Sequence, residues 1–167
     1  MLTVGTEADI KAPPAVVWQV LADFGSFPRW TAAATLDRSP DRPDELTYAI
    51  RVTARGGGVR PWAFVGRLRT LEPPQRLAWT AGLPGILTLA VSFDLGAWGG
   101  HTHVRHEARL SGLVAWIRPG LMRRIFQSVV DRTLRDLDAE VRRVRRGGPR
   151  PSVAAPGRPG RGGRPGR

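Results

Sequence analysis

The stretch LMRRIFQSVVDRTLRDLDAEVRRV, residues 121–144, decides the fold because it predicts one long amphipathic helix. Arginine and aspartate fill one side of this helix, and a proline and several glycines flank the run, as is typical of helix ends. A helix with so many charges is not stable alone in water, so the rest of the chain must cover its apolar face. The apolar residues recur every three or four positions and share that face: Leu121, Ile125, Val129, Leu134, Leu137, Val141 and Val144, widened in the first half by Met122, Phe126 and Val130.

The segments before this helix alternate apolar and polar residues with a period of two, which is the pattern of half-buried β-strands. Residues 2–10 form the first such segment, and two short helices are expected after it, over residues 15–23 and 26–30. From residue 33 to residue 110 the period of two returns, interrupted by short turns rich in glycine and proline. Short turns require antiparallel neighbours. We therefore predict an α+β fold in which a curved antiparallel sheet of six or seven strands wraps its apolar face around the C-terminal helix.

The last predicted strand, residues 101–110, separates its two faces clearly. The inner face carries Thr102, Val104, His106, Ala108 and Leu110, whereas the outer face is entirely polar: His101, His103, Arg105, Glu107 and Arg109. If residues 95 and 102 pair across the preceding turn, His106 faces Val91 on the inside and His103 faces Asp94 on the outside.

Composition restricts the class of protein. The chain has 167 residues, enough for one domain with its own core, and no cysteine, which excludes disulfides and thiolate metal sites. The N-terminal segment lacks the basic region and apolar run of a signal peptide, and no segment reaches the roughly 18 apolar residues of a membrane span. We expect a soluble, cytoplasmic protein.

The basic charge is concentrated at the C-terminus. The chain carries a net charge of +12, and seven arginines with no acidic residue lie from Arg145 onward. Residues 147–167 are mostly glycine, proline and arginine with little to bury, so we expect a folded domain over residues 1–146 and a disordered tail over residues 147–167. The tail has no aromatic residues for base stacking, and we expect at most weak contact with nucleic acid or an anionic membrane. The domain itself is compatible with a monomer or a homodimer.

Three segments resemble a known superfamily. IKAPPAVVWQVLADFGSFPRW (10–30), LRTLEPPQRLAW (68–79) and GGHTHVRHEARLSG (99–112) resemble the opening, a middle turn and the last strand of the helix-grip fold. This is the START-related SRPBCC superfamily, which includes proteins similar to polyketide cyclases and dehydrases. The resemblance covers about residues 1–144 and implies a large cavity between sheet and helix that holds a small apolar molecule.

The inward faces supply the candidate ligand-binding residues. Trp30, Trp62 and Trp116 are expected near the cavity mouth, where they either grip a flat ligand or serve only as core and rim packing. The full set of candidates is Trp30, Tyr48, Ile50, Trp62, Phe64, Trp79, Val91, Phe93, His106, Met122, Ile125, Phe126 and Val129.

The inward residues offer little catalytic chemistry. They include no charged side chain, no carboxylate pair and no nucleophile elbow, and no glycine-rich phosphate loop is present. His106 and Tyr48 are the candidate catalytic residues for acid–base work on a ketone or enol, but they would equally orient a ligand or play a structural part. Burial should lower the pKa of His106, with no inward carboxylate to oppose it. His101 and His103 have a spacing that metal sites use, but they face outward, so we expect a surface His–Asp pair, no metal and no cofactor.

Three functions remain open from the sequence: binding of a small apolar ligand (lipid-, polyketide- or aromatic-like), a polyketide cyclase or dehydratase using His106 and Tyr48, and a protein-interaction module like the co-chaperone relatives of this fold. The scarcity of inward polar groups favours the first over the second.

Overall fold

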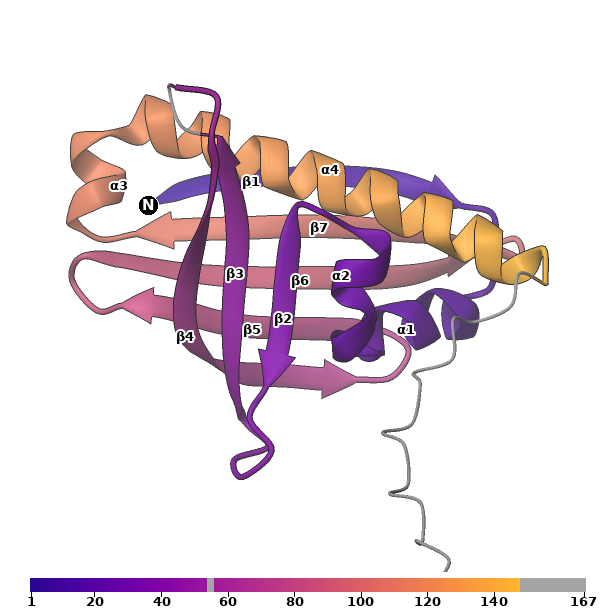
Figure 1. The fold of residues 1–167 in the computed structure, drawn as a ribbon. Helices are drawn as coiled ribbons and strands as arrows, with labels where there is room; N and C mark the ends of the chain where they lie inside the picture. Colours follow the sequence, from indigo (N-terminus) through magenta and orange to yellow (C-terminus); the bar gives the residue numbers. More distant parts are fainter. Residues whose placement is uncertain (54–55, 148–167) are drawn as a thin grey trace, which may run out of the picture.

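The computed structural model describes residues 1–53 and 56–147 and contains the predicted α+β fold (Figure 1). Ala54, predicted on an inner strand face, and the predicted tail beyond Gly147 lie outside the described residues. The elements follow in the order β1 (Leu2–Ile10), α1 (Pro14–Ala22), a 3-10 turn (Phe24–Ser26), α2 (Phe27–Trp30), β2 (Ala34–Arg38), β3 (Glu45–Thr53), β4 (Val59–Glu72), β5 (Arg76–Leu83), β6 (Leu87–Trp98), β7 (His101–Ser111), α3 (Leu113–Ile117) and α4 (Pro119–Arg145).

The seven strands form one antiparallel sheet in the order β1-β7-β6-β5-β4-β3-β2. Figure 1 shows the sheet curling, so that β2, β3 and β4 run across the direction of the other four strands, and α4 lies along the concave side. A register shift in β4 between Leu68 and Thr70 adds local twist where the sheet turns. Among the helices of residues 1–53 and 56–147, none is both long and apolar enough to span a membrane.

The buried face of α4 is the predicted one in its second half, whereas in the first half it is rotated toward Met122 and Phe126. Leu121 is 42% exposed, whereas Met122 next to it is 2% exposed, and Ile125 is only partly buried. The first half of the helix lies beside β1, where the side-chain amide of Gln127 donates to the carbonyl oxygen of Gly5 at 3.0 Å. All of the buried residues of α4 except Thr133 belong to the face that the sequence predicts: Met122, Phe126, Val129, Val130, Thr133, Leu134, Leu137 and Val141.

The β6–β7 hairpin corrects the predicted register. Gly99 and Gly100, with φ of 51° and 81°, make a two-residue turn between Trp98 and His101, so Leu95 pairs with Val104 and not with Thr102. This shift of two residues leaves every side chain on its predicted face but changes its partner across the hairpin. His106 consequently lies opposite Phe93 and not Val91, and His103 lies opposite Gly96 and not Asp94.

Candidate functional site

Four rings from four strands form a continuous row across the concave face of the sheet. Tyr48 on β3 meets Trp79 on β5 edge-on, with ring centroids 5.3 Å apart, and Trp79 lies 6.1 Å from Phe93 on β6. His106 on β7 stacks flat on Phe93, with centroids 3.8 Å apart and an interplanar angle of 5°. All four side chains are buried in the core, as the sequence predicts.

His106 is a neutral ring in the protein interior. It is 1% exposed, and its Nδ1 lies 3.0 Å from the carbonyl oxygen of Ser92, which can only accept, so Nδ1 carries the hydrogen. Burial lowers the pKa of His106 to about 4. The Ser92 hydrogen bond and the charge of Asp131 on α4 oppose this shift, so the expectation that no inward carboxylate acts on His106 was wrong. In the neutral ring, Nε2 is a hydrogen-bond acceptor.

The structure does not bring Tyr48 and His106 together as a catalytic pair. The Trp79 and Phe93 rings lie between them in the row, and no hydrogen bond joins the two side chains. Burial raises the pKa of Tyr48, so its hydroxyl stays protonated at physiological pH. Tyr48 and His106 are therefore two separate polar side chains among apolar neighbours.

Two further polar atoms are buried in this interior without a hydrogen-bond partner among the described residues. They are the indole nitrogen of Trp79 and the hydroxyl of Thr133, which belongs to the sheet-facing side of α4. An unpaired buried polar group costs about 1–3 kcal/mol, so a hydrogen bond from a bound molecule or water would stabilise it. Thr133 was missed by sequence reasoning because it interrupts the apolar spacing of the helix. The hydroxyl of Thr102, in contrast, has a partner within the protein, because it donates a hydrogen bond to the carbonyl oxygen of Ala12 at 2.7 Å.

A cavity of about 180 Å³ opens between α4 and the end of β3. Val52, Ile125 and Val129 form its apolar side, and Thr53 and Ser128 add hydroxyl groups. Three arginines complete the lining, one on β3 and two on α4: Arg51, Arg124 and Arg132. No ion pair joins any of these three to a carboxylate in the described part of the chain.

The predicted tryptophans do not gather at this cavity. Trp30 packs on Phe27 with ring centroids 4.6 Å apart, and its indole N–H donates to the Ser26 hydroxyl at 3.2 Å, so it serves as packing. Trp62 is partly buried on β4, and Trp116 is 80% exposed on α3, where it lines no part of the cavity. The remaining candidates lie in the core or packed against it: Ile50, Phe64, Val91, Met122 and Phe126.

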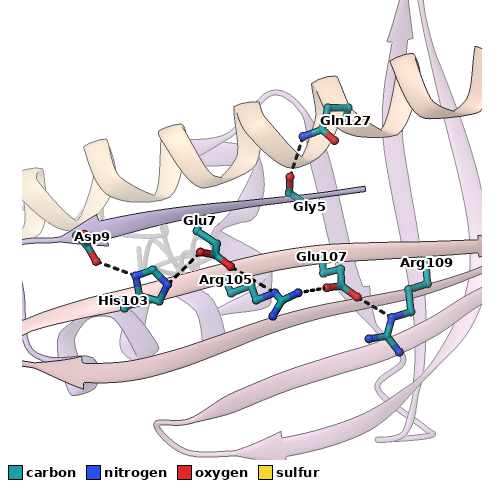
Figure 2. Close-up of polar contacts among 8 residues, drawn as sticks. All are labelled: Gly5, Glu7, Asp9, His103, Arg105, Glu107, Arg109 and Gln127. Atoms are coloured by element: carbon teal, nitrogen blue, oxygen red, sulfur yellow. Dashed lines mark hydrogen bonds and ion pairs between the residues drawn. The ribbon is translucent and has the colours of Figure 1, made fainter. Parts of the chain in front are cut away.

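The outer face of β7 is less exposed to solvent at Glu107 than the sequence predicts. The Glu107 side chain is only 9% exposed, because Arg109 and Arg105 on either side of it bind its two carboxylate oxygens at 2.6 and 3.0 Å (Figure 2). The hydrogen bond from Arg109 is the main cause that lowers the pKa of Glu107. The alternation of polar and apolar residues places Glu107 on the correct face, but it does not show that the longer arginine side chains on either side cover this carboxylate.

His103 forms the predicted surface pair with a different carboxylate. Its Nδ1 lies 2.8 Å from Asp9 on β1, and its Nε2 lies 3.4 Å from Glu7 (Figure 2), while Asp94 is bound by Arg76 instead. The hydrogen bond to Asp9 raises the pKa of His103. Within residues 1–53 and 56–147, no group of three or more metal-ligating side chains is arranged to hold an ion.

The sequence profile of the family described as "Polyketide cyclase / dehydrase and lipid transport" matches residues 1–142. The chain belongs to this polyketide cyclase/dehydrase and lipid transport family. No curated protein matches the sequence significantly.

Solved structures share the fold of this polyketide cyclase/dehydrase family member. A protein of Thermus thermophilus superposes with a TM-score of 0.68 at 15% identity, covering 85% of this chain and 98% of its own. A START superfamily protein of Mycobacterium smegmatis gives 0.65 at 13% identity, covering 85% and 98%. The di-domain ARO/CYC StfQ of the steffimycin biosynthetic pathway gives 0.65 at 13% identity, covering 87% of this chain and 52% of that protein. At these identities the likeness establishes the helix-grip fold alone.

Proposed function

We propose that this protein binds a small apolar molecule with one anionic end, held between the curved sheet and α4. Family membership supports a ligand in this position. The observation that carries the proposal is the cavity between α4 and the end of β3, called the mouth cavity below, where the apolar side chains of Val52, Ile125 and Val129 meet three arginines without ion-pair partners among the described residues. An amphipathic ligand matches both kinds of surface, because its tail replaces water on the apolar side and its anionic group neutralises the arginines.

The arginines at the mouth differ from others on the same helix. In the second half of α4, Arg142 pairs with Asp138 and Arg143 pairs with Glu140, so their charges are balanced within the helix. In the first half, Arg124 and Arg132 have no such partner in the described chain, and Arg51 reaches the same cavity from β3. A guanidinium group binds carboxylate or phosphate through two parallel hydrogen bonds, so these three side chains suit such a group.

The interior provides polar anchors for the rest of the ligand. The Trp79 indole N–H, the Thr133 hydroxyl and the acceptor nitrogen of neutral His106 would each form a hydrogen bond with a ligand oxygen or hydroxyl. Ligand pockets usually measure about 300–1,000 Å³. The cavity of about 180 Å³ is smaller. We therefore propose that α4 moves away from β3 when a complete ligand is bound.

A cyclase or dehydratase reaction is the second candidate, because the family description includes such enzymes. The geometry gives it less support. A histidine whose pKa is about 4 is a weak base near neutral pH, and Tyr48 is too far along the row of rings to share a proton with it. No observation specifically favours the co-chaperone-like alternative.

The test uses a fluorescent fatty acid, cis-parinaric acid, together with its methyl ester. Replacing Arg51 and Arg124 with glutamine should weaken binding of the acid by about tenfold or more and leave binding of the ester unchanged, since only the acid offers a charge. Arg135→Gln is the matched control, because Arg135 lies on the same helix without an ion pair to a described residue but outside the cavity lining. Equal binding of acid and ester, or an equal loss in the control, would contradict the anionic end. Absence of binding by both probes would contradict ligand binding itself.

A further inference from the structure

Exposed apolar side chains gather at one end of the molecule. Of the eleven large hydrophobic residues exposed in the described chain, six come from the end of β5, the β5–β6 turn, α3 and the first turn of α4. In Figure 1, α3 lies at the same end of the sheet as the β5–β6 turn. We call this set the apolar tip: Leu83 (63% exposed), Ile86 (52%), Leu113 (55%), Trp116 (80%), Ile117 (56%) and Leu121 (42%).

Backbone hydrogen bonds hold the segments of the apolar tip together. The amide of Leu113 donates to Gly85 and that of Val114 to Ile86, each at 3.0 Å, which fixes α3 against the β5–β6 turn. Gly112 permits this contact: its φ is +105°, and a Cβ there would lie 2.7 Å from the Ile86 carbonyl oxygen. The exposure of Trp116 and Ile117 is therefore a property of ordered backbone.

The charges around the apolar tip have one sign. Residues 77–93 carry no charged side chain, and residues 108–130 carry arginines but no acid. Arg118, between α3 and α4, and Arg123, on α4, flank the tip, and neither makes an ion pair with a described residue. An exposed tryptophan and aliphatic side chains bordered by arginine are the pattern of a surface that enters the headgroup region of a bilayer.

We propose that the apolar tip docks this protein on an anionic lipid bilayer. Each apolar side chain that leaves water contributes favourably, and anionic headgroups neutralise the flanking arginines. A second copy of the chain is a less suitable partner for the apolar tip than a bilayer. A two-fold contact through the tip would place Arg118 and Arg123 of both copies near each other, with no acid on the tip segments to compensate. Docking here stands apart from the ligand proposed above, because none of the six tip residues lines the mouth cavity.

The test measures binding of the full chain to vesicles of phosphatidylcholine mixed with phosphatidylglycerol, by flotation. The arginine-rich C-terminal segment is present in every variant, so differences report the tip. Trp116→Ser combined with Ile117→Ser should weaken vesicle binding about tenfold or more. Trp98→Ser is the matched control: Trp98 is 77% exposed but lies at the other end of β6, about 35 Å from Leu87 along the strand, and its replacement should leave binding unchanged.

A second readout locates the contact without removing side-chain volume. Phosphatidylcholine with brominated acyl chains should quench the tryptophan fluorescence of the wild type in the anionic vesicles, and Trp116→Phe should remove most of this quenching while binding persists. Trp98→Phe should leave the quenching intact. Unchanged vesicle binding in the double variant, or unchanged quenching in Trp116→Phe, would overturn the proposal. It would also be overturned if sedimentation without lipid showed a dimer that the double variant converts to a monomer.

Discussion

At the scale of single residues, His106 makes the stability of the protein depend on pH. Its pKa is about 4 in the folded protein against 6.5 for an unperturbed histidine, so between these values the unfolded chain binds the extra proton. The contribution of His106 to the free energy of unfolding is therefore fully present above pH 6.5. It is lost as the pH falls toward 4, and the loss from this residue is up to about 3 kcal/mol. His103, whose pKa is raised, contributes with the opposite sign, but it is 44% exposed and solvent screens its interactions.

The His106→Phe variant tests this dependence. Phenylalanine keeps the stacking on Phe93 but cannot be protonated, so the free energy of unfolding should vary less between about pH 6.5 and 4 than in the wild type. Urea titrations at several pH values within this window provide the measurement. At neutral pH the variant should be only about 1 kcal/mol less stable, from loss of the hydrogen bond to Ser92. Parallel curves for the two proteins would show that His106 is already protonated when folded.

Glu107 gives a second residue-scale prediction. Its lowered pKa means that it contributes stability above its unfolded pKa and loses that contribution as the pH falls through the folded value. Glu107→Gln should cost about 1 kcal/mol at neutral pH, a modest figure because Arg105 and Arg109 are more than half exposed. The difference from the wild type should disappear in acid. Glu7→Gln, which alters a 53% exposed side chain of the same network, should have a smaller effect, and an equal loss would contradict the role of burial.

At the scale of elements, α4 holds the sheet in its curled shape. Leu137 is fully buried on its inner face, so Leu137→Ala should lower the free energy of unfolding by roughly 2–5 kcal/mol. Leu121→Ala on the same helix is the control, because Leu121 is 42% exposed and should cost well under about 1 kcal/mol. Thermal and urea unfolding of the two variants measure both free energies of unfolding. Comparable losses would mean that the sequence-predicted face, which included Leu121, is the buried one.

The contrast between Leu121 and Leu137 also marks how far the sequence could predict the elements. Periodicity identifies the strands and the helix because each has one buried face, and it placed His106 inside correctly even though the hairpin register was off by two residues. The rotation of the first half of α4 depends on its contact with β1, which no local pattern reports. The burial of Glu107 and the hairpin turn at Gly99 likewise depend on neighbouring strands and on backbone geometry.

The candidate site was less predictable than the fold for the same reason. The inward faces could be read residue by residue, so the inward positions of Tyr48, Trp79, Phe93 and His106 were expected, whereas the stacking of their rings in one row was not. The mouth cavity, in contrast, joins Arg51 on β3 to Arg124 and Arg132 on α4, which are far apart in the chain. Each of these arginines looks like an ordinary solvent-facing charge in its own segment. Only the packing of helix against sheet shows that they surround one opening.

At the scale of the whole molecule, the two halves of α4 have different surroundings. The second half of α4 is fastened: Asp136 accepts a hydrogen bond from the Thr31 hydroxyl at 2.8 Å, and Leu137 and Val141 are fully buried. The first half borders the mouth cavity, where Ile125 is partly buried and Arg124 has no ion-pair partner in the described chain. The movement of α4 away from β3 that is proposed above should therefore involve the first half of the helix, because the cavity lies there.

Hydrogen exchange measured by mass spectrometry tests this division of α4. Amides of residues 121–132 should exchange faster than those of residues 133–145 in the free protein, and cis-parinaric acid should slow the first group selectively, because the bound acid would bridge α4 and β3. The Arg51→Gln, Arg124→Gln double variant serves as the control: the acid should protect residues 121–132 much less in it at the same concentration, while exchange in residues 133–145 stays as in the wild type. Uniform exchange along the helix, or protection confined to its second half, would show that the ligand does not enter between α4 and β3.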